Sequence, residues 1–275
     1  MRGVLAIVVL AGCYGPTFPD GVACTTSREC PGALTCSHGL CVTHAPTDDG
    51  GSGSDAAACT PIVVGPGALT APRVTTIAID GDLSDWPTCF VTLDAHTAIV
   101  RDITGLGDYS TGKFSVAHDA TRVYLAAEVT GVAPLGDQPV PAIYQNDSIS
   151  IYLDADGVFT TAAYDPDAMQ LVIDHAGRIQ GFRNGALVAA NLTTATRSVG
   201  TTFTIEVALQ PSTLSAAAFA STIGFDIGFE SGDGTTQTSE LVWFESCGPP
   251  ACGCTDGSSA PFCDARQLGT AALAP

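Results

Sequence analysis

The segment Ile223-Gly224-Phe225-Asp226-Ile227-Gly228-Phe229-Glu230 alternates between apolar residues and small or acidic ones. A period of two is typical of a β-strand that buries one face and exposes the other. The same alternation occurs in residues 123–129, 149–153 and 203–209. One apolar face per strand is what a pair of packed antiparallel sheets requires. The sequence therefore predicts an all-β, antiparallel, two-sheet β-sandwich of the jelly-roll-like kind.

Other segments support this prediction more weakly. Shorter or less regular apolar patterns predict five further strands, at residues 114–117, 170–174, 178–182, 241–244 and 268–273. Only Pro211 to Ala220 favours a short helix, because proline is well tolerated in the first turn and the rest is rich in alanine.

The domain is expected to begin with a strand and a tight turn. Val74 to Ile79 predicts a short strand, and Asp80-Gly81 after it is strong turn chemistry. Asp82 to Trp86 continues as a polar turn that ends on a large aromatic residue. We interpret Trp86 as a core residue in preference to a ligand contact, because tryptophan is usually well buried in folded proteins.

The composition excludes one class of partner. The chain has 275 residues, 17 prolines, 30 glycines and a net charge of −18, and Lys113 is its single lysine. So acidic a surface repels phosphate backbones, which argues against nucleic-acid binding. The charge can attract divalent cations, although solubility alone also explains it.

The N-terminus predicts a lipid anchor. Met1-Arg2 and the short apolar run Val4 to Leu10 precede Leu10-Ala11-Gly12-Cys13, which resembles the lipobox of bacterial lipoproteins, where cleavage before the cysteine is followed by its lipidation. The run is too short to span a bilayer. An ordinary secretory signal with a disulfide-bonded cysteine is the alternative. Because Tyr14 follows the cysteine, the same resemblance implies the outer membrane, with the protein facing the periplasm or the exterior.

Eleven cysteines predict disulfides outside the cytoplasm, and without Cys13 an even number, ten, remains. We expect a signal peptide (1–12), a cysteine-rich segment (13–44), a flexible acidic linker (45–58) and the sandwich (59–275). For the cysteine-rich segment, a loose resemblance to interleaved extracellular knots favours Cys24–Cys36 with Cys30–Cys41. Cys59 is expected to pair with Cys89, and the late group, residues 247, 252, 254 and 263, to pair internally.

Several motifs together resemble the family 9 carbohydrate-binding modules. Residues 80–86 (DGDLSDW) are similar to the opening DGxLxDW of that family, and residues 122–129 to its next strand. Residues 144–154 (YQNDSISIYLD) resemble its W-x-x-D-S-V-E strand with tyrosine in place of tryptophan, while 224–230 and 268–270 resemble its late and closing strands. The resemblance implies a sandwich that binds polysaccharide or oligosaccharide, often with calcium, without catalysis. The cysteine-rich insertion from Cys247 to Cys263 departs from the pattern and could reshape or cover a site.

Enzymatic motifs are absent from the sequence. It contains no G-x-S-x-G and no H-E-x-x-H, and its five histidines are scattered. Acid pairs such as Asp154 and Asp226 can be nominated for glycoside hydrolysis, but nothing in the sequence singles them out. We therefore predict a protein that is not an enzyme.

The resemblance implies that Tyr144 and Trp243 form two walls of a sugar site, because aromatic faces pack on the C–H faces of sugar rings. Trp243 alternates with Val242 and Phe244, however, and fits the core equally well. We expect Glu240, with Arg178 or Arg183, to hydrogen-bond the sugar hydroxyls, because charged groups make the stronger hydrogen bonds.

The predicted calcium ligands are Asp80, Asp82 and Asp85. Asp154-Ala155-Asp156-Gly157 imitates the start of an EF-hand loop, but Val158 and Asp165 stand where later ligands are required, so a turn is preferred.

These predictions lead to a non-catalytic carbohydrate-binding lipoprotein at the bacterial cell surface, joined to the membrane only through its lipid anchor. The alternatives are a structural or adhesion module that contacts protein and an accessory subunit of a glycan-degrading assembly.

Overall fold

The computed structural model describes the backbone of residues 35–37, 40–42 and 102, and the whole of residues 59–101, 103–105, 107–132, 135–158, 163–184, 186–188, 190, 192–244 and 265–275. The chain divides into two compact units, Met1–Ala57 and Ala58–Pro275. In the first unit, β1 (Thr35–Ser37) and β2 (Leu40–Val42) pair antiparallel. The predicted signal peptide, Cys13, the linker and the 247–263 insertion lie outside the described residues, as do the side chains of the predicted cysteine pairs other than Cys59–Cys89.

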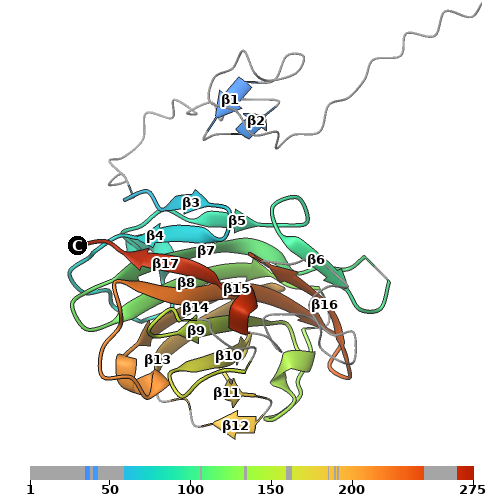
Figure 1. The fold of residues 1–275 in the computed structure, drawn as a ribbon. Helices are drawn as coiled ribbons and strands as arrows, with labels where there is room; N and C mark the ends of the chain where they lie inside the picture. The colour runs from blue at the N-terminus through green and yellow to red at the C-terminus, as the bar shows by residue number, and fades with distance from the viewer. Residues whose placement is uncertain are drawn as a thin grey trace, which may run out of the picture. The chain divides into compact units, whose positions relative to one another are not determined.

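The second unit contains two β-sheets, and Figure 1 shows their strands in layers. The ten-stranded sheet has the order β12 (Ala186–Val188), β11 (Ile179–Arg183), β10 (Ala168–Asp174), β9 (Ser148–Asp154), β15 (Thr222–Gly232), β17 (Gly269–Leu273), β4 (Ala68–Ala71) and β3 (Val63–Gly65), with β16 (Gln237–Val242) between β15 and β6 (Ile99–Asp102). The five-stranded sheet has the order β13 (Thr193–Val199), β14 (Thr202–Leu209), β8 (Val123–Thr130), β7 (Thr111–His118) and β5 (Val91–Leu93). Every pair of strands is antiparallel except β17 with β4. The predicted all-β, two-sheet sandwich is confirmed.

The core lies between the sheets and uses the apolar faces that the alternation predicts. Ile149, Ile151 and Leu153 of β9 are fully buried there, together with Phe225 and Phe229 of β15. Since successive side chains of a strand point to opposite faces, the residues between them lie on the outer face of the ten-stranded sheet.

The segment from Val74 to Phe90 covers part of the outer face of the other sheet. Ile77 and Trp86 form a separate apolar cluster with Tyr124 of β8, and Trp86 donates a hydrogen bond through Nε1 to Thr88 Oγ1 at 2.7 Å. The interpretation of Trp86 as a buried packing residue is confirmed. The strand predicted at 74–79 is wrong: this stretch lies across the sheet as irregular chain, because its apolar side chains pack onto a sheet face instead of extending a sheet edge.

Two other element predictions need correction. The helix expected from Pro211 to Ala220 is a single 3-10 turn, η4 (Pro211–Leu214), which ends at Ser215 in the left-handed conformation with φ 63°. The strand expected at 241–244 is β16, which begins at Gln237 and ends at Val242, so Trp243 and Phe244 lie beyond it.

The predicted disulfide Cys59–Cys89 is confirmed, with an S–S distance of 2.04 Å. Within the described residues, no helix has the length and apolar character needed to cross a membrane.

Candidate functional site

Polar side chains cross the outer face of the ten-stranded sheet in a straight row. Strand register aligns Asp174 of β10, Ser148 of β9, Glu230 of β15, Glu240 of β16 and Arg101 of β6. A second row beside it aligns a glutamine, a tyrosine and an aspartate from three of these strands, namely Gln170, Tyr152 and Asp226. Ser150 lies between the rows. We call seven residues of β10, β9, β15, β16 and β6 the polar face: Arg101, Ser150, Tyr152, Gln170, Asp226, Glu230 and Glu240.

Glu240 is the centre of this network. Its Oε2 accepts a hydrogen bond from Arg101 Nη1 at 2.9 Å, and its Oε1 accepts one from the Tyr152 hydroxyl at 2.9 Å. Gly228 makes room for this carboxylate, because a Cβ atom at that position would lie 2.7 Å from Glu240 Oε1. Glu240 is 3 % exposed, so these bonds hold it in one orientation away from solvent.

A second chain of hydrogen bonds lies alongside. Gln170 Nε2 donates to Ser150 Oγ at 3.1 Å and to the Tyr152 hydroxyl at 3.4 Å, and Ser150 in turn donates to the Glu230 carboxylate. Two polar atoms on this face, Gln170 Oε1 and Asp226 Oδ2, are buried and have no hydrogen-bond partner among the described residues. A buried polar atom without a partner costs free energy, so a hydrogen-bonding group supplied from outside would be favourable here.

Burial changes the ionisation of these acids. It raises the pKa of Asp226 and of Glu230 well above the ordinary range of a carboxyl group, and the negative charge of Glu240 raises both further. Because one guanidinium, that of Arg101, lies among three carboxyl groups, the face favours a neutral or donor-rich partner over another anion.

Tyr144 lies on η3 (Ile143–Gln145), next to the strands that carry the polar face, and is 36 % exposed. Two residues further on, Asn146 donates from Nδ2 to Asp174 Oδ2 at 3.1 Å. Arg178 donates to the same Asp174 oxygen at 2.6 Å and also pairs with Asp137 at 2.7 Å. The fold thus brings the predicted residues Tyr144 and Arg178 into one region, where Arg178 is already engaged by two aspartates.

The structure does not bring Trp243 to Tyr144. The Trp243 ring packs against Phe225 at 5.8 Å and against Phe114 of the opposite sheet at 6.1 Å, which places it among the core aromatics. It points away from Glu240 because the alternation of β16 continues through it. The half-buried Trp243 ring thus packs against core aromatics, which supports the alternative left open by its alternation with Val242 and Phe244. A sugar-binding wall at Trp243 stays a prediction.

Arg183 is bound to the backbone of a neighbouring strand. It lies at the end of β11, where its Nε donates to the backbone oxygen of Ala168 at 2.9 Å. Of the predicted sugar contacts, only Glu240 belongs to the polar face. Tyr152, Gln170 and Arg101 were missed, although period-two alternation already assigned Tyr152, Asp226 and Glu230 to outer strand faces.

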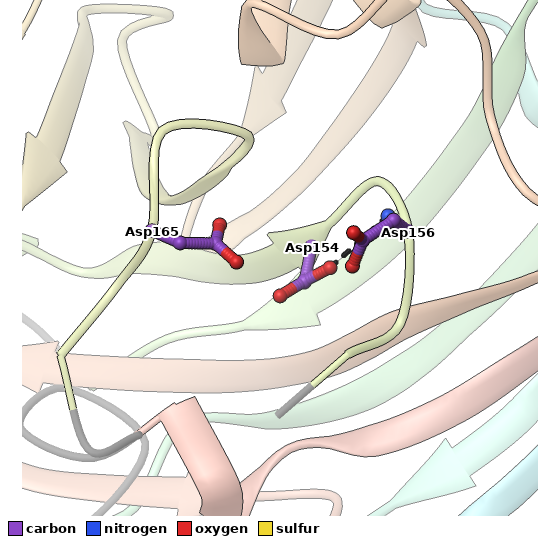
Figure 2. A group of neighbouring side chains, drawn as sticks. All are labelled: Asp154, Asp156 and Asp165. Carbon is purple, nitrogen blue, oxygen red and sulfur yellow. Dashed lines mark hydrogen bonds between the residues drawn. The ribbon is translucent and has the colours of Figure 1, made fainter. Parts of the chain in front are cut away.

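Three aspartates meet beside the end of β9. Figure 2 shows the carboxylates of Asp154, Asp156 and Asp165 turned toward one another, and their ligand oxygens lie within 4.8 Å of each other. Burial raises the pKa of Asp154 to about 6, with the nearby Asp165 adding to the effect. An all-oxygen donor set suits a hard cation such as calcium, and a cation would relieve the repulsion among the three acids.

The aspartates of the first turn are arranged differently. Asp80 Oδ1 accepts the Asp82 amide at 2.9 Å, and Asp82 Oδ1 accepts the Ser84 amide at 3.0 Å, where it caps η2 (Leu83–Asp85). These three are not among the groups of converging ligand atoms in the described part of the chain. Calcium binding by Asp80, Asp82 and Asp85 stays a prediction.

The comparisons with known proteins agree with this architecture. Residues 79–274 match the family described as carbohydrate family 9 binding domain-like. The chain belongs to this family. Its members are non-catalytic carbohydrate-binding modules, and the expectation of a protein that is not an enzyme is confirmed at that level. The chain finds no match among curated proteins.

Two solved structures of a family 9 module from Caldicellulosiruptor kristjanssonii are similar in fold. The complex with glucose has a TM-score of 0.52 at 15% identity and covers 75% of this chain and 95% of that one. The complex with cellotriose has a TM-score of 0.51 at 15% identity and covers 74% and 92%. At this identity the likeness shows a shared fold.

Proposed function

We propose that this family 9 module binds carbohydrate through the polar face, with Tyr144 at its edge. One observation carries the proposal: Gln170 Oε1 and Asp226 Oδ2, both buried without a described partner, lie within a network of fixed donors and acceptors. Sugar hydroxyls donate and accept hydrogen bonds, and a preorganised polar network of this kind fixes their orientation at low entropic cost. The partially exposed ring of Tyr144 offers an apolar surface to a sugar ring.

Access to the face is restricted. Tyr152 forms a second apolar cluster with Tyr164 of the β9–β10 connection, Ala265 of η5 (Ala265–Gln267) and Leu268, and Glu230 is 2 % exposed. A saccharide therefore reaches the face only if residues packed over it move aside, so association is expected to be slow compared with diffusion.

The proposal also includes display at the outer membrane through lipidated Cys13. Its support is the lipobox-like sequence Leu10-Ala11-Gly12-Cys13. In this arrangement, the 45–58 linker, which has no large apolar residue, would hold the module at a distance on the order of 20 Å from the lipid.

Replacement of Gln170 by methionine tests the site. The substitution keeps the length of the side chain and removes its donor and its unpartnered acceptor, so we expect affinity for glycans to fall about tenfold or more. Tyr144→Ala should lower affinity to a similar extent through the loss of its ring. A glycan array identifies the saccharide, and isothermal titration calorimetry then measures affinity for it.

Gln210→Met is the control, because Gln210 is an exposed glutamine that directly follows β14 of the five-stranded sheet, whereas the polar face belongs to the ten-stranded sheet. Equal affinities for the three variants and the wild type would contradict this location of the site. If the wild type binds nothing on the array, the result favours the alternative of a module that contacts protein. The deep burial of the polar face is the specific support for that alternative.

A structural calcium ion completes the proposal, held by Asp154, Asp156 and Asp165. Calcium titrated into metal-stripped protein is expected to release heat and to raise the melting temperature. Because ligands must be deprotonated and the pKa of Asp154 is about 6, affinity should fall as the pH drops from 7.5 to 5.

Asp156→Asn is expected to weaken calcium binding, whereas Asp82→Asn should leave it unchanged. The reverse pattern would assign calcium to the first turn and support the ligand set Asp80, Asp82 and Asp85. No heat and no change in melting temperature in the wild type would remove calcium from the proposal altogether.

A further inference from the structure

We propose that the open half of the outer face of the five-stranded sheet is a second carbohydrate-binding groove, which takes a neutral saccharide chain. The Val74–Phe90 segment covers only the other half of this face. Glu206 anchors it there, accepting the amides of Asp80 at 2.8 Å and Gly81 at 2.6 Å, and Thr204 Oγ1 donates to the Gly81 oxygen at 3.0 Å. Beyond this point the sheet face is hollowed into a groove of about 430 Å³.

The floor of the groove consists of two rows of polar side chains. Register aligns Lys113 of β7, Glu128 of β8, Thr204 of β14 and Arg197 of β13 across four strands. The adjacent row on the same face aligns Thr111, Thr130, Thr202 and Val199, of which Thr202 and Val199 line the groove. Neighbouring strands lie about 4.8 Å apart, so this floor presents hydrogen-bonding groups at regular intervals along a line that crosses the sheet.

Apolar groups border this floor. Phe90 and Leu83, both partially exposed, line one side, and Val199, which is 70% exposed, lines the other. Lys113 Nζ lies 5.2 Å from the centroid of the Phe90 ring. A polar floor with an aromatic ring at its side suits a sugar, whose hydroxyls need hydrogen bonds and whose C–H faces need an apolar surface. The volume lies within the range of about 300–1,000 Å³ usual for small-molecule sites.

The charges of the groove select a neutral ligand. Lys113 pairs with Glu128 at 3.0 Å, and both side chains are about two-fifths exposed. Arg197 is exposed, and its guanidinium makes no hydrogen bond or ion pair with the described residues; it lies close enough to Asp82 to lower the pKa of that acid, after the hydrogen bonds from Ser84. The two cations, Lys113 and Arg197, balance the two carboxylates, Glu128 and Asp82. The groove therefore offers hydrogen-bond donors and acceptors in equal measure and carries no net charge that would attract an ion.

The two sites have a joint consequence. The polar face and the second groove lie on the outer faces of opposite sheets, so one short saccharide cannot occupy both. A module with both sites can bridge two glycan chains. The inference takes its ligand class from the proposed function but rests on different residues, so the two can be tested apart.

The test is a titration of the ¹⁵N-labelled full chain with cellotriose, and then with a panel of neutral oligosaccharides, followed by amide chemical shifts. We expect the amides of Arg197, Thr202 and Thr204 to shift and to keep shifting in the Gln170→Met variant. Arg197→Ala should weaken this response about tenfold, since it removes the exposed charged donor. Thr202→Trp should abolish it by filling the groove, and a tryptophan is well tolerated on a strand face.

Arg73→Ala is the matched control, because Arg73 is also an exposed arginine without a described side-chain partner and lies outside this groove. Shifts at β9 and β16 without shifts at β13 and β14 would overturn the second groove and leave the proposed function standing. Shifts at β13 and β14 alone support the groove and contradict the site proposed on the polar face. Absence of any shift across the panel overturns both.

Discussion

Replacement of Glu240 by glutamine is expected to destabilise the domain by about 3 kcal/mol, because it removes the charged partner of Arg101 in a buried ion pair. The glutamine amide can still approach Tyr152, so the loss of stability measures the removal of the charge more than a change in the shape of the side chain. Urea denaturation at pH 7 measures the change in the free energy of unfolding.

Glu128→Gln is the matched control. The Lys113–Glu128 pair has a similar separation, 3.0 Å, but lies at the surface with both side chains about two-fifths exposed, and surface pairs contribute about 0–1 kcal/mol. Equal effects of the two substitutions would show that Glu240 is not held in the buried pair described here. Replacing Arg101 and Glu240 together by methionine and leucine should restore much of the loss, because apolar residues often substitute well for a buried pair.

Replacement of Trp243 by alanine is expected to destabilise the domain by about 3 kcal/mol and to lower its melting temperature by several degrees. The Trp243 ring fills space between Phe114 and Phe225, and its Cζ3 lies 2.8 Å from where a Cβ would stand on Gly269. Removing so large a side chain from a packed site costs its burial and leaves a cavity. Thermal unfolding followed by near-ultraviolet circular dichroism measures both the stability and the aromatic packing.

Tyr144→Ala is the comparison for Trp243→Ala, because Tyr144 is a large aromatic residue at the surface and should cost less than about 1 kcal/mol. A stable Trp243→Ala protein that has lost glycan binding would contradict the packing role and return Trp243 to the sugar site.

The sequence by itself determined the sandwich. Period-two alternation depends on local geometry, so Phe225 and Ile227, or Ile149 and Ile151, could be assigned to the core before any fold was known. The turn at Asp80-Gly81 and the burial of Trp86 were also predictable, since each depends on a short stretch. Strand β13 was missed because Thr193–Val199 carries little apolar pattern: it is an edge strand whose side chains are largely exposed or half-buried.

Only the tertiary structure decided which polar residues meet. Alternation assigns Tyr152, Asp226 and Glu230 to outer faces, but it does not say which strands are neighbours. The pairing of β9, β15, β16 and β6 joins these residues to Glu240 and Arg101. The packing of Trp243 was also decided only by the tertiary structure, because Trp243 sits in a segment that carries apolar residues on both faces. Its packing against Phe114 depends on a contact between residues 129 positions apart in two different sheets, and no local pattern contains that information.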